Sequence, residues 1–355
     1  MGNPLELQAA PAPAVLDAAL GLALATGAPL RLSGPLSDAD LDLALAAVRL
    51  GDPAAVDAAR AELQKTSPEL LLPHPRPGLH VLELRSPGAV QRALFTFPWP
   101  LSLLGKPSEL RLQGPNHVQG QPTFHDLRFG WAPLAARLGL RLGLELLEAG
   151  FSPGEGEIVA SLDPAPALTP LHVVHRGLLR QVGILLAAGR NEAGVEAAQH
   201  AAKLLRRQGV IAEPERVPLP VPAASRGRWA ITATAEFEHA TVSLSELGPP
   251  ARMAAAENEA EQIGERLAKR LAAFLQRGGA VDAATAERLL LPSFLCAAGL
   301  GARAGPPPTC HFTTSEVTAA LVETATLARL ALPIRAVVSG APGEEGVIVV
   351  APEKP

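Results

Sequence analysis

The chain has 355 residues, more than one domain usually holds, which predicts two domains or one domain with a large insertion. Hydrophobic residues make up 48% and charged residues 19%, so the chain is able to form a core and is neither disordered nor fibrous. The formal net charge of -4 excludes a general electrostatic attraction to nucleic acids and leaves only local basic patches for such contacts.

Cysteine usage and hydropathy bear on the compartment. Cys296 and Cys310 are too few for a disulfide framework or a four-thiolate zinc site, so we expect a reducing, cytoplasmic compartment. Gly, Pro or Arg interrupts the apolar runs before they reach the roughly 18 residues that a membrane helix needs. The first residues carry no export or lipidation signal, so we expect no contact with a membrane.

Three segments repeat one order of elements: an apolar helical run, a proline, a short alternating strand, and then glycine with proline. They are residues 16–35, 94–115 and 321–342. Within them Pro29, Pro107 and Pro333 end the helix and begin the extended segment, because the proline ring fixes φ and removes a backbone donor. We therefore expect the α+β fold class, with repeated helix-and-sheet units that form the core.

After the second repeat, charged residues recur at a spacing near 3.6 with leucines between them. They are Arg137, Arg141, Glu145 and Glu148. This spacing predicts an amphipathic surface helix from Pro133 to Gly150. The turn FSPGEGE and the strand IVASL follow it.

Residues 176–275 differ in pattern from the rest of the chain. We expect a strand in LLRQVGILLA and then a helix that begins at the cap Asn191 and ends at Gly209. Further strands are expected at 210–219, 229–237 and 240–244, and a closing helix at 254–276. Four strands and two helices suffice for a small core. The sequence therefore predicts an inserted α+β domain, residues 176–275, within a larger core of residues 1–175 and 276–355.

Near its C-terminus the chain reads TCHFTTSEV, residues 309–317, with a histidine between a cysteine and a cluster of hydroxyls. Together with the preceding TAERLLLPSFLCAAG, this segment resembles the C-terminal end of the RNA 3'-terminal phosphate cyclases and their cyclase-like relatives. LDAALGLALATGAP resembles the family's first helix and turn, and PLAARLGLRLGLELLEAGFSPGEGEIVASL resembles its long helix and Gly-rich hairpin. The family's nucleophilic histidine stands in a Cys-His-x-x-Thr setting and falls on His311. The resemblance runs through most of the chain, including the inserted domain.

The resemblance implies an enzyme that uses ATP, with Mg²⁺ or Mn²⁺, to convert the 3'-phosphate at an RNA 3' end into a 2',3'-cyclic phosphate through a histidyl-AMP intermediate. His311 would be the catalytic residue, since a neutral imidazole nitrogen is able to attack the α-phosphorus of ATP and divide the activation into two transfers. Thr313 and Thr314 would orient the ring or the phosphate. Glu287 takes the position of an acidic residue near the nucleotide, where it would hold the metal or fix the imidazole tautomer.

Each histidine and carboxylate also has a structural interpretation. His311 beside a helix start would otherwise be a cap or a hydrogen-bonded core residue, and Glu287 a carboxylate on a solvated helix face. His172 and His175 lie three positions apart in a strand-like segment, where they point to opposite faces, so we interpret them as structural and expect no protein-built metal site. The basic cluster Lys203, Arg206 and Arg207 either complements its helix dipole or contacts RNA.

Three stretches depart from the family pattern. Where the family has a Gly-rich stretch that closes on an arginine, the chain carries prolines, which offer no N–H to a phosphate, and a carboxylate. The substituted positions are Ala10, Pro11, Ala12, Pro13 and Asp17 there, Asp38, Asp40 and Asp42 in place of two arginines, and Asn116, His117, Val118 and Gln119 in place of Thr-Asp-Asn-Pro. These losses favour a second function, a catalytically inactive cyclase-like protein that binds RNA or a protein partner. The candidates to replace the lost phosphate contacts are Arg31, Arg49, Arg128 and Arg288.

Overall fold

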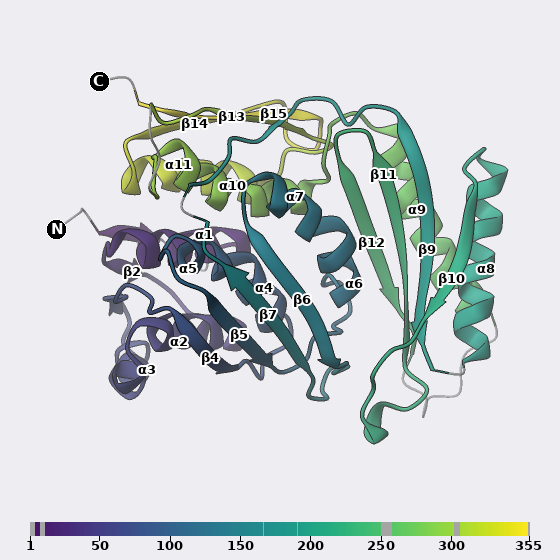
Figure 1. Ribbon diagram of the computed structural model, residues 1–355, viewed down its shortest axis with the longest axis horizontal. Helices are drawn as coiled ribbons and strands as arrows, with labels where there is room; N and C mark the ends of the chain where they lie inside the picture. The colour runs from purple at the N-terminus through teal and green to yellow at the C-terminus, as the bar shows by residue number, and fades with distance from the viewer. Residues whose placement is uncertain are drawn as a thin grey trace.

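The computed structural model describes residues 4–7, 11–165, 167–189, 191–249, 258–301 and 306–353. They form an α+β fold, as the repeats predict (Figure 1). The strands are β1 Leu5–Leu7, β2 Leu30–Leu32, β3 Glu69–Leu70, β4 Gly78–Glu83, β5 Ser108–Gln113, β6 Arg141–Glu148, β7 Glu157–Asp163, β8 His172–Val173, β9 Leu179–Ala188, β10 Ala212–Val217, β11 Trp229–Phe237, β12 Thr241–Leu247, β13 Cys310–Thr314, β14 Ile334–Ser339 and β15 Gly346–Pro352. The helices are α1 Pro13–Thr26, α2 Asp38–Gly51, α3 Val56–Glu62, α4 Ala89–Thr96, α5 Pro98–Ser102, α6 Phe124–Asp126, α7 Ala132–Arg137, α8 Glu192–Arg207, α9 Glu259–Gln276, α10 Ala283–Ala297 and α11 Ala319–Ala331.

The strands of the described residues assemble into separate sheets. Their orders are β1-β2-β3, β4-β5-β7-β6, β14-β15-β13-β8 and β10-β9-β11-β12. Helices α10 and α11 lie directly beneath the sheet that contains β13, and α1 lies beneath those helices (Figure 1). Each sheet thus buries one face against helices, the arrangement expected of an α+β protein.

Helix α1 is the centre of the core because it is apolar on nearly every side. Leu16, Leu20 and Leu24 have no exposed surface, and the helix contacts α4, α10 and α11. Its Gly21 lies against α10, where an added Cβ would come within 2.4 Å of Leu291 Cδ2. This close approach brings the middle of α1 beside the middle of α10.

The three repeated segments adopt the predicted order of elements. Helix α1 is followed by β2, helices α4 and α5 by β5, and helix α11 by β14. Pro29, Pro107 and Pro333 each lie between the helix and the strand of their repeat. The prediction of repeated helix-and-strand units is therefore confirmed.

The predicted helix from Pro133 to Gly150 is wrong beyond its first turns. Helix α7 ends at Arg137, Gly139 takes a positive φ of 93°, and the chain then continues as strand β6. In β6 every second residue is exposed, and the alternate leucines at 142, 144 and 146 pack against the core. Charged residues four apart, such as Arg141 and Glu145, lie on one face of a helix and also on one face of a strand, whereas leucines two apart lie on one face of a strand alone. The segment pairs with β7 as a strand.

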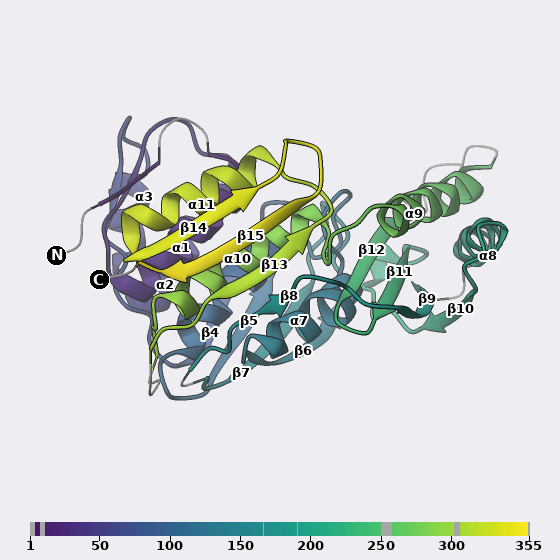
Figure 2. The ribbon, with the colours of Figure 1, turned by 90° about the horizontal axis from the view of Figure 1, so that it is seen from above.

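The elements expected between residues 176 and 275 are largely as predicted. Strands β9, β10, β11 and β12 form one sheet, and helices α8 and α9 lie side by side on one of its faces (Figure 2). Asn191 caps α8 by accepting a hydrogen bond from the backbone N–H of Gly194 at 2.8 Å. Helix α9 begins at Glu259, and residues 254–257 of the predicted helix lie outside the described residues. The sheet and helices surround their own hydrophobic cluster.

The two ends of this segment meet at one arginine. Arg176 donates to the carbonyl oxygens of Phe274 and Leu275 at 3.0 and 2.8 Å. Its guanidinium also lies 4.9 Å from the ring centroid of Phe237 and 5.0 Å from that of Phe274. The chain therefore enters and leaves the β9–α9 unit at neighbouring points.

Among the described helices, none combines the length and hydropathy needed to cross a lipid bilayer.

Candidate functional site

Two adjoining cavities open beside the middle of α10. The larger, of about 240 Å³, lies between α1, α4 and α10, and the smaller, of about 120 Å³, lies between α10, the segment 120–131 and strand β12. Both are lined by Phe95, Gln121 and Arg288. The two cavities therefore meet at these three side chains.

A buried ion triad forms one wall of the larger cavity. Arg92 of α4 lies 2.7 Å from Asp17 of α1 and 2.7 Å from Asp40 of α2. The other oxygen of Asp40 accepts a hydrogen bond from the backbone N–H of Ser37 at 3.0 Å and so completes the capping box of α2. One guanidinium thus serves two carboxylates. Burial raises the pKa of Asp17 to about 6, although Arg92 opposes the shift.

Arg288 stands where the cavities meet. Its guanidinium carbon lies 4.0 Å from the centroid of the Phe95 ring, which is a close cation–π contact. Asp282, Glu287, Asp126 and Asp17 attract it from a distance, yet none of the hydrogen bonds or ion pairs of the described chain involves its guanidinium. Burial lowers the pKa of Arg288. A cation held by an aromatic ring, with its N–H groups unengaged, is suited to an anionic ligand.

Glu287 lines the larger cavity from the same helix. Its carboxylate accepts a hydrogen bond from the Thr318 hydroxyl at 2.6 Å, and Thr318 also caps the N-terminus of α11. Burial raises the pKa of Glu287 against the opposing effects of Thr318 and Arg288. Glu287 therefore lies on the wall of the larger cavity, and its role near a nucleotide stays a prediction.

Two buried donors beside the cavities have no partner among the described residues. The hydroxyl of Thr96, in a fully buried residue, lines the larger cavity. The indole N–H of Trp131, a residue 5% exposed, lines the smaller one. A buried donor without an acceptor costs free energy, so such groups indicate a place for a ligand or water.

The structure does not bring His311 to these cavities. Cys310, Phe312 and Thr314 are the buried residues of β13, and they face α10 and α11, whereas His311 and Thr313 point to the other face of the sheet. On that face His311 pairs with His172 of β8 and Val349 of β15. Helices α10 and α11 lie beneath the opposite face (Figure 1). Neither cavity is lined by a histidine of the described chain.

The two threonines near His311 are engaged by the backbone. Thr313 donates to the carbonyl of Val174 at 2.8 Å and accepts from the N–H of Ala280 at 2.9 Å. Thr314 donates to the carbonyl of Glu316 at 3.0 Å and accepts from its N–H at 3.3 Å. Of the four predicted site residues, Glu287 lines a cavity, and the structure leaves His311, Thr313 and Thr314 apart from it.

A divalent cation fits this site only together with a phosphate ligand. No group of three or more His, Cys, Asp or Glu side chains suited to a metal occurs in the part of the chain that the structure describes. Mg²⁺ commonly binds through one or two carboxylates and the phosphates of its substrate. Asp17 and Glu287 are the carboxylates that line the larger cavity, and Asp17 is paired with Arg92. Glu287 is therefore the residue suited to a phosphate-bound cation.

The family motif has an arginine at the position of Asp17, and this comparison says nothing about the partner of Asp17. The pairing with Arg92 therefore could not be predicted from the motif. The available signal was Arg92 itself, a charged residue within the apolar segment AVQRALF. Of the four arginines considered as phosphate ligands, Arg288 lines the cavities. Arg31 instead pairs with Glu6 and Glu69 on the surface.

A family model described as RNA 3'-terminal phosphate cyclase matches residues 52–338. A protein named RNA 3'-terminal phosphate cyclase from Ralstonia nicotianae is 29% identical over 313 residues, which cover 85% of each chain. Its namesake from Methylococcus capsulatus is 32% identical over 215 residues, 59% of this chain and 57% of the relative. Another, from Pseudomonas aeruginosa, is 28% identical over 263 residues, 73% of this chain and 71% of the relative.

Proposed function

The chain belongs to the RNA 3'-terminal phosphate cyclase family, and we propose that it converts an RNA 3'-phosphate into a 2',3'-cyclic phosphate with ATP, in the two cavities beside α10. The observation that carries this proposal is Arg288, a half-buried cation without an ion-pair partner in the described chain, at the junction of the cavities.

The reaction needs two phosphorus centres to be held close together. In the activation, an oxygen of the RNA 3'-phosphate becomes joined to AMP, and ATP loses pyrophosphate. In the cyclisation, the adjacent 2'-oxygen bonds to the 3'-phosphorus, its proton is lost, and AMP leaves. Negative charge develops on phosphate oxygens in both steps, so N–H donors that are fixed before the reaction stabilise the transition states.

The residues at the junction match these needs. Arg288 donates to phosphate oxygens from a position open to both cavities, and the hydroxyl of Thr96 and the indole of Trp131 supply further donors. Glu287 would hold Mg²⁺ or Mn²⁺ bound to the nucleotide, where the cation neutralises phosphate charge. Arg92 keeps Asp17 and Asp40 from repelling the phosphates.

A second function is favoured by one observation. The resemblance implies transfer of AMP through a histidine, and the alternating burial along β13 places the side chain of His311 on the sheet face opposite α10. A cyclase-fold protein that binds the nucleotide or the RNA end without transferring AMP accounts for this placement.

One experiment separates the two functions. The full chain is incubated with a 3'-phosphorylated RNA oligonucleotide, ATP and Mg²⁺ or Mn²⁺, and the RNA ends are analysed for the 2',3'-cyclic phosphate. Formation of the cyclic end supports the proposed function. Saturable binding of ATP or of the RNA without any cyclic product supports the second function, and the absence of both binding and product contradicts both.

A further inference from the structure

A third cavity, of about 470 Å³, lies away from α10 where the segment 116–119 meets the β9–α9 unit. It is lined from one side by His117, Gln119 and Ser152, and from the other by Arg228 and Arg266 with the end of β12. None of these residues takes part in the site described above. His117, Val118 and Gln119, which line the cavity, belong to the stretch 116–119 where the sequence departs from the family pattern.

The hydrogen bonds around His117 fix its tautomer. Asn116 donates through Nδ2 to the carbonyl of Glu148 at 2.9 Å, and its Oδ1 accepts from the N–H of Gly150 at 2.9 Å. The same Oδ1 lies 2.7 Å from Nδ1 of His117, so Nδ1 must carry the proton and donate. Burial lowers the pKa of His117 to about 3, which keeps the ring neutral. Its Nε2 is therefore an acceptor.

This acceptor is unused in the described chain. His117 has no exposed surface, lines the third cavity, and its Nε2 has no hydrogen-bond partner there. The ring is held in place by Phe151, with ring centroids 4.8 Å apart. A fixed, buried acceptor that lines a cavity is suited to a hydroxyl or amino group of a ligand.

Two arginines add positive charge to the same cavity. The guanidinium of Arg228 lies 4.6 Å from the centroid of Phe151, and its Nε is buried without a hydrogen-bond partner in the described chain. The guanidinium of Arg266 lies 3.5 Å from Glu246 and is half-exposed. The cavity is also lined by Glu259, whose carboxylate offsets part of this charge. The two cations and the neutral acceptor match a phosphate next to a hydroxyl.

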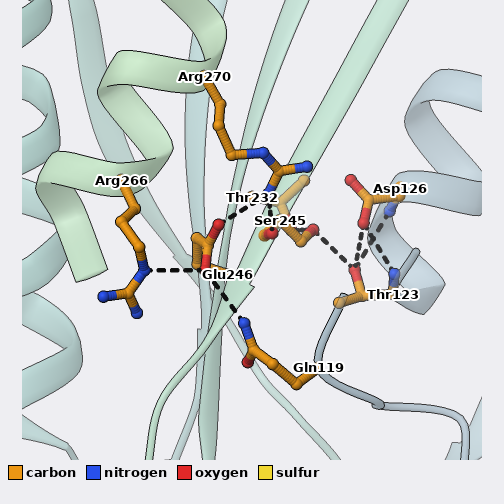
Figure 3. A network of polar contacts seen from close by, with 8 residues as sticks. All are labelled: Gln119, Thr123, Asp126, Thr232, Ser245, Glu246, Arg266 and Arg270. Carbon is orange, nitrogen blue, oxygen red and sulfur yellow. Dashed lines mark hydrogen bonds and ion pairs between the residues drawn. The ribbon is translucent and has the colours of Figure 1, made fainter. Parts of the chain in front are cut away.

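The third cavity and the smaller cavity beside α10 are neighbours. Arg266 lines the third cavity and Arg270, one helical turn along α9, lines the smaller one. Between them Glu246 accepts from Arg270 at 2.7 Å and from Gln119 at 3.3 Å (Figure 3). Arg266, Arg270 and Arg288 therefore lie in a row from the third cavity to the junction at α10, with Glu246 paired to the first two.

We propose that the third cavity binds a ribose-phosphate unit of the RNA strand upstream of the 3' end, with the phosphate on Arg228 and Arg266 and a ribose 2'-hydroxyl donating to Nε2 of His117. This assignment rests on the proposed function, because the ligand of the third cavity is the same RNA strand whose terminal phosphate that function places beside Arg288. A 2'-hydroxyl is the group that distinguishes RNA from DNA at such a contact.

The test measures the affinity of the full chain for a 3'-phosphorylated oligoribonucleotide over a range of salt concentrations. Arg266→Ala and Arg228→Met are each expected to weaken binding about tenfold or more, the cost of one charged hydrogen bond, and to lower the salt slope by about one. Arg335→Ala, at an exposed position of β14, is the matched control and keeps wild-type affinity. If both cavity variants bind like the wild type, the proposal is overturned.

The hydroxyl contact is tested through the ligand, which avoids disturbing the buried histidine. Single 2'-deoxy substitutions are placed at each upstream position in turn. One position is expected to weaken binding by several-fold in the wild type, and to have no such effect in His117→Phe. Equal affinity for every deoxy-substituted strand would show that His117 does not contact a 2'-hydroxyl. If AMP binds as tightly as the oligonucleotide and is equally sensitive to Arg266→Ala, the cavity is a free-nucleotide site and the proposal is overturned.

Failure of this inference and failure of the proposed function give different results. If cyclic phosphate forms and the cavity variants behave as wild type, the proposed function stands and the inference falls. If the variants and the deoxy substitutions weaken RNA binding while no cyclic phosphate forms, the inference stands and the second function holds.

Discussion

Arg92 Nη2 lies 2.7 Å from Asp17 Oδ1, which ties helix α4 to the first turns of α1. The same guanidinium lies 2.7 Å from Asp40 on α2, so three helices converge on one cation that is 9% exposed. In the protein core, removal of one member of such a group leaves the others buried without a counter-charge. The triad therefore stabilises the wall of the candidate site.

Replacement of Arg92 tests this role. Arg92→Met should lower the free energy of unfolding by about 3–5 kcal/mol, because Asp17 and Asp40 would stay buried without their cation. Chemical denaturation measures the change. Arg31→Ala is the control: its partners Glu6 and Glu69 lie on the surface, so its midpoint should hardly move. Equal midpoints for Arg92→Met and the wild type would contradict the proposed importance of the triad.

The raised pKa of Asp17 predicts a specific pH dependence. Its pKa is about 6 in the folded protein and 3.8 as the unperturbed value, so between these pH values the folded state holds the proton more tightly than the unfolded state. The contribution of Asp17 to stability is therefore fully present below about pH 4 and is lost as the pH rises through 6.

Comparison with Asp17→Asn isolates this effect from other titrating groups. The stability difference between the variant and the wild type should shift in favour of the variant as the pH rises from 4 to 7. Thermal unfolding at a series of pH values measures it. A difference that does not change with pH would show that the pKa of Asp17 is not raised by folding.

The sequence patterns predicted helices and strands better than they predicted contacts between side chains that are distant along the chain. Prolines marked where helices give way to strands, and Asn191 marked the start of α8, because these signals depend on neighbours along the chain. Strand β6 was missed because the helix prediction rested on charged residues about four apart, a spacing that also fits one face of a strand, and pairing with β7 forms the strand.

The candidate site shows the same division. Glu287 was predicted from a motif and lines a cavity, whereas the motif around His311 could not reveal which face of β13 the side chain occupies. The Arg92 triad joins helices that are remote in sequence, as do His117 and Arg228 at the third cavity. Contacts of this kind depend on the tertiary fold, and a single sequence does not contain them.

Gly264 sets the distance between helices α8 and α9. A Cβ at this position would come 2.2 Å from the carbonyl oxygen of Ala197, so the helices would have to move apart. Gly264→Ala should therefore destabilise the protein by about 1–3 kcal/mol, although alanine favours a helix intrinsically. Gly183→Ala in β9, where a Cβ meets open space, is the control and should cost little. A Gly264→Ala protein as stable as the wild type would contradict the close packing of α8 on α9.

We propose that residues 176–275 form a separable domain. The segment has its own hydrophobic cluster, and Arg176 joins its beginning to the end of α9. A chain that connects residue 175 to 276 through a short glycine linker, and the isolated segment, should each unfold cooperatively in calorimetry. The outcome that speaks against two domains is failure of both pieces to fold.

The central claim of this account is that the cavities beside α10, and not the outer face of the β13 sheet, are where the RNA end reacts. The most direct measurement is formation of the 2',3'-cyclic phosphate from 3'-phosphorylated RNA and ATP by the wild type, Arg288→Met and His311→Ala, with His175→Ala as the control for a surface histidine. We predict that Arg288→Met loses activity by at least about tenfold, since a charged contact to phosphate is removed, while His311→Ala and His175→Ala retain it. Loss of activity in His311→Ala, with full activity in Arg288→Met, would contradict the account.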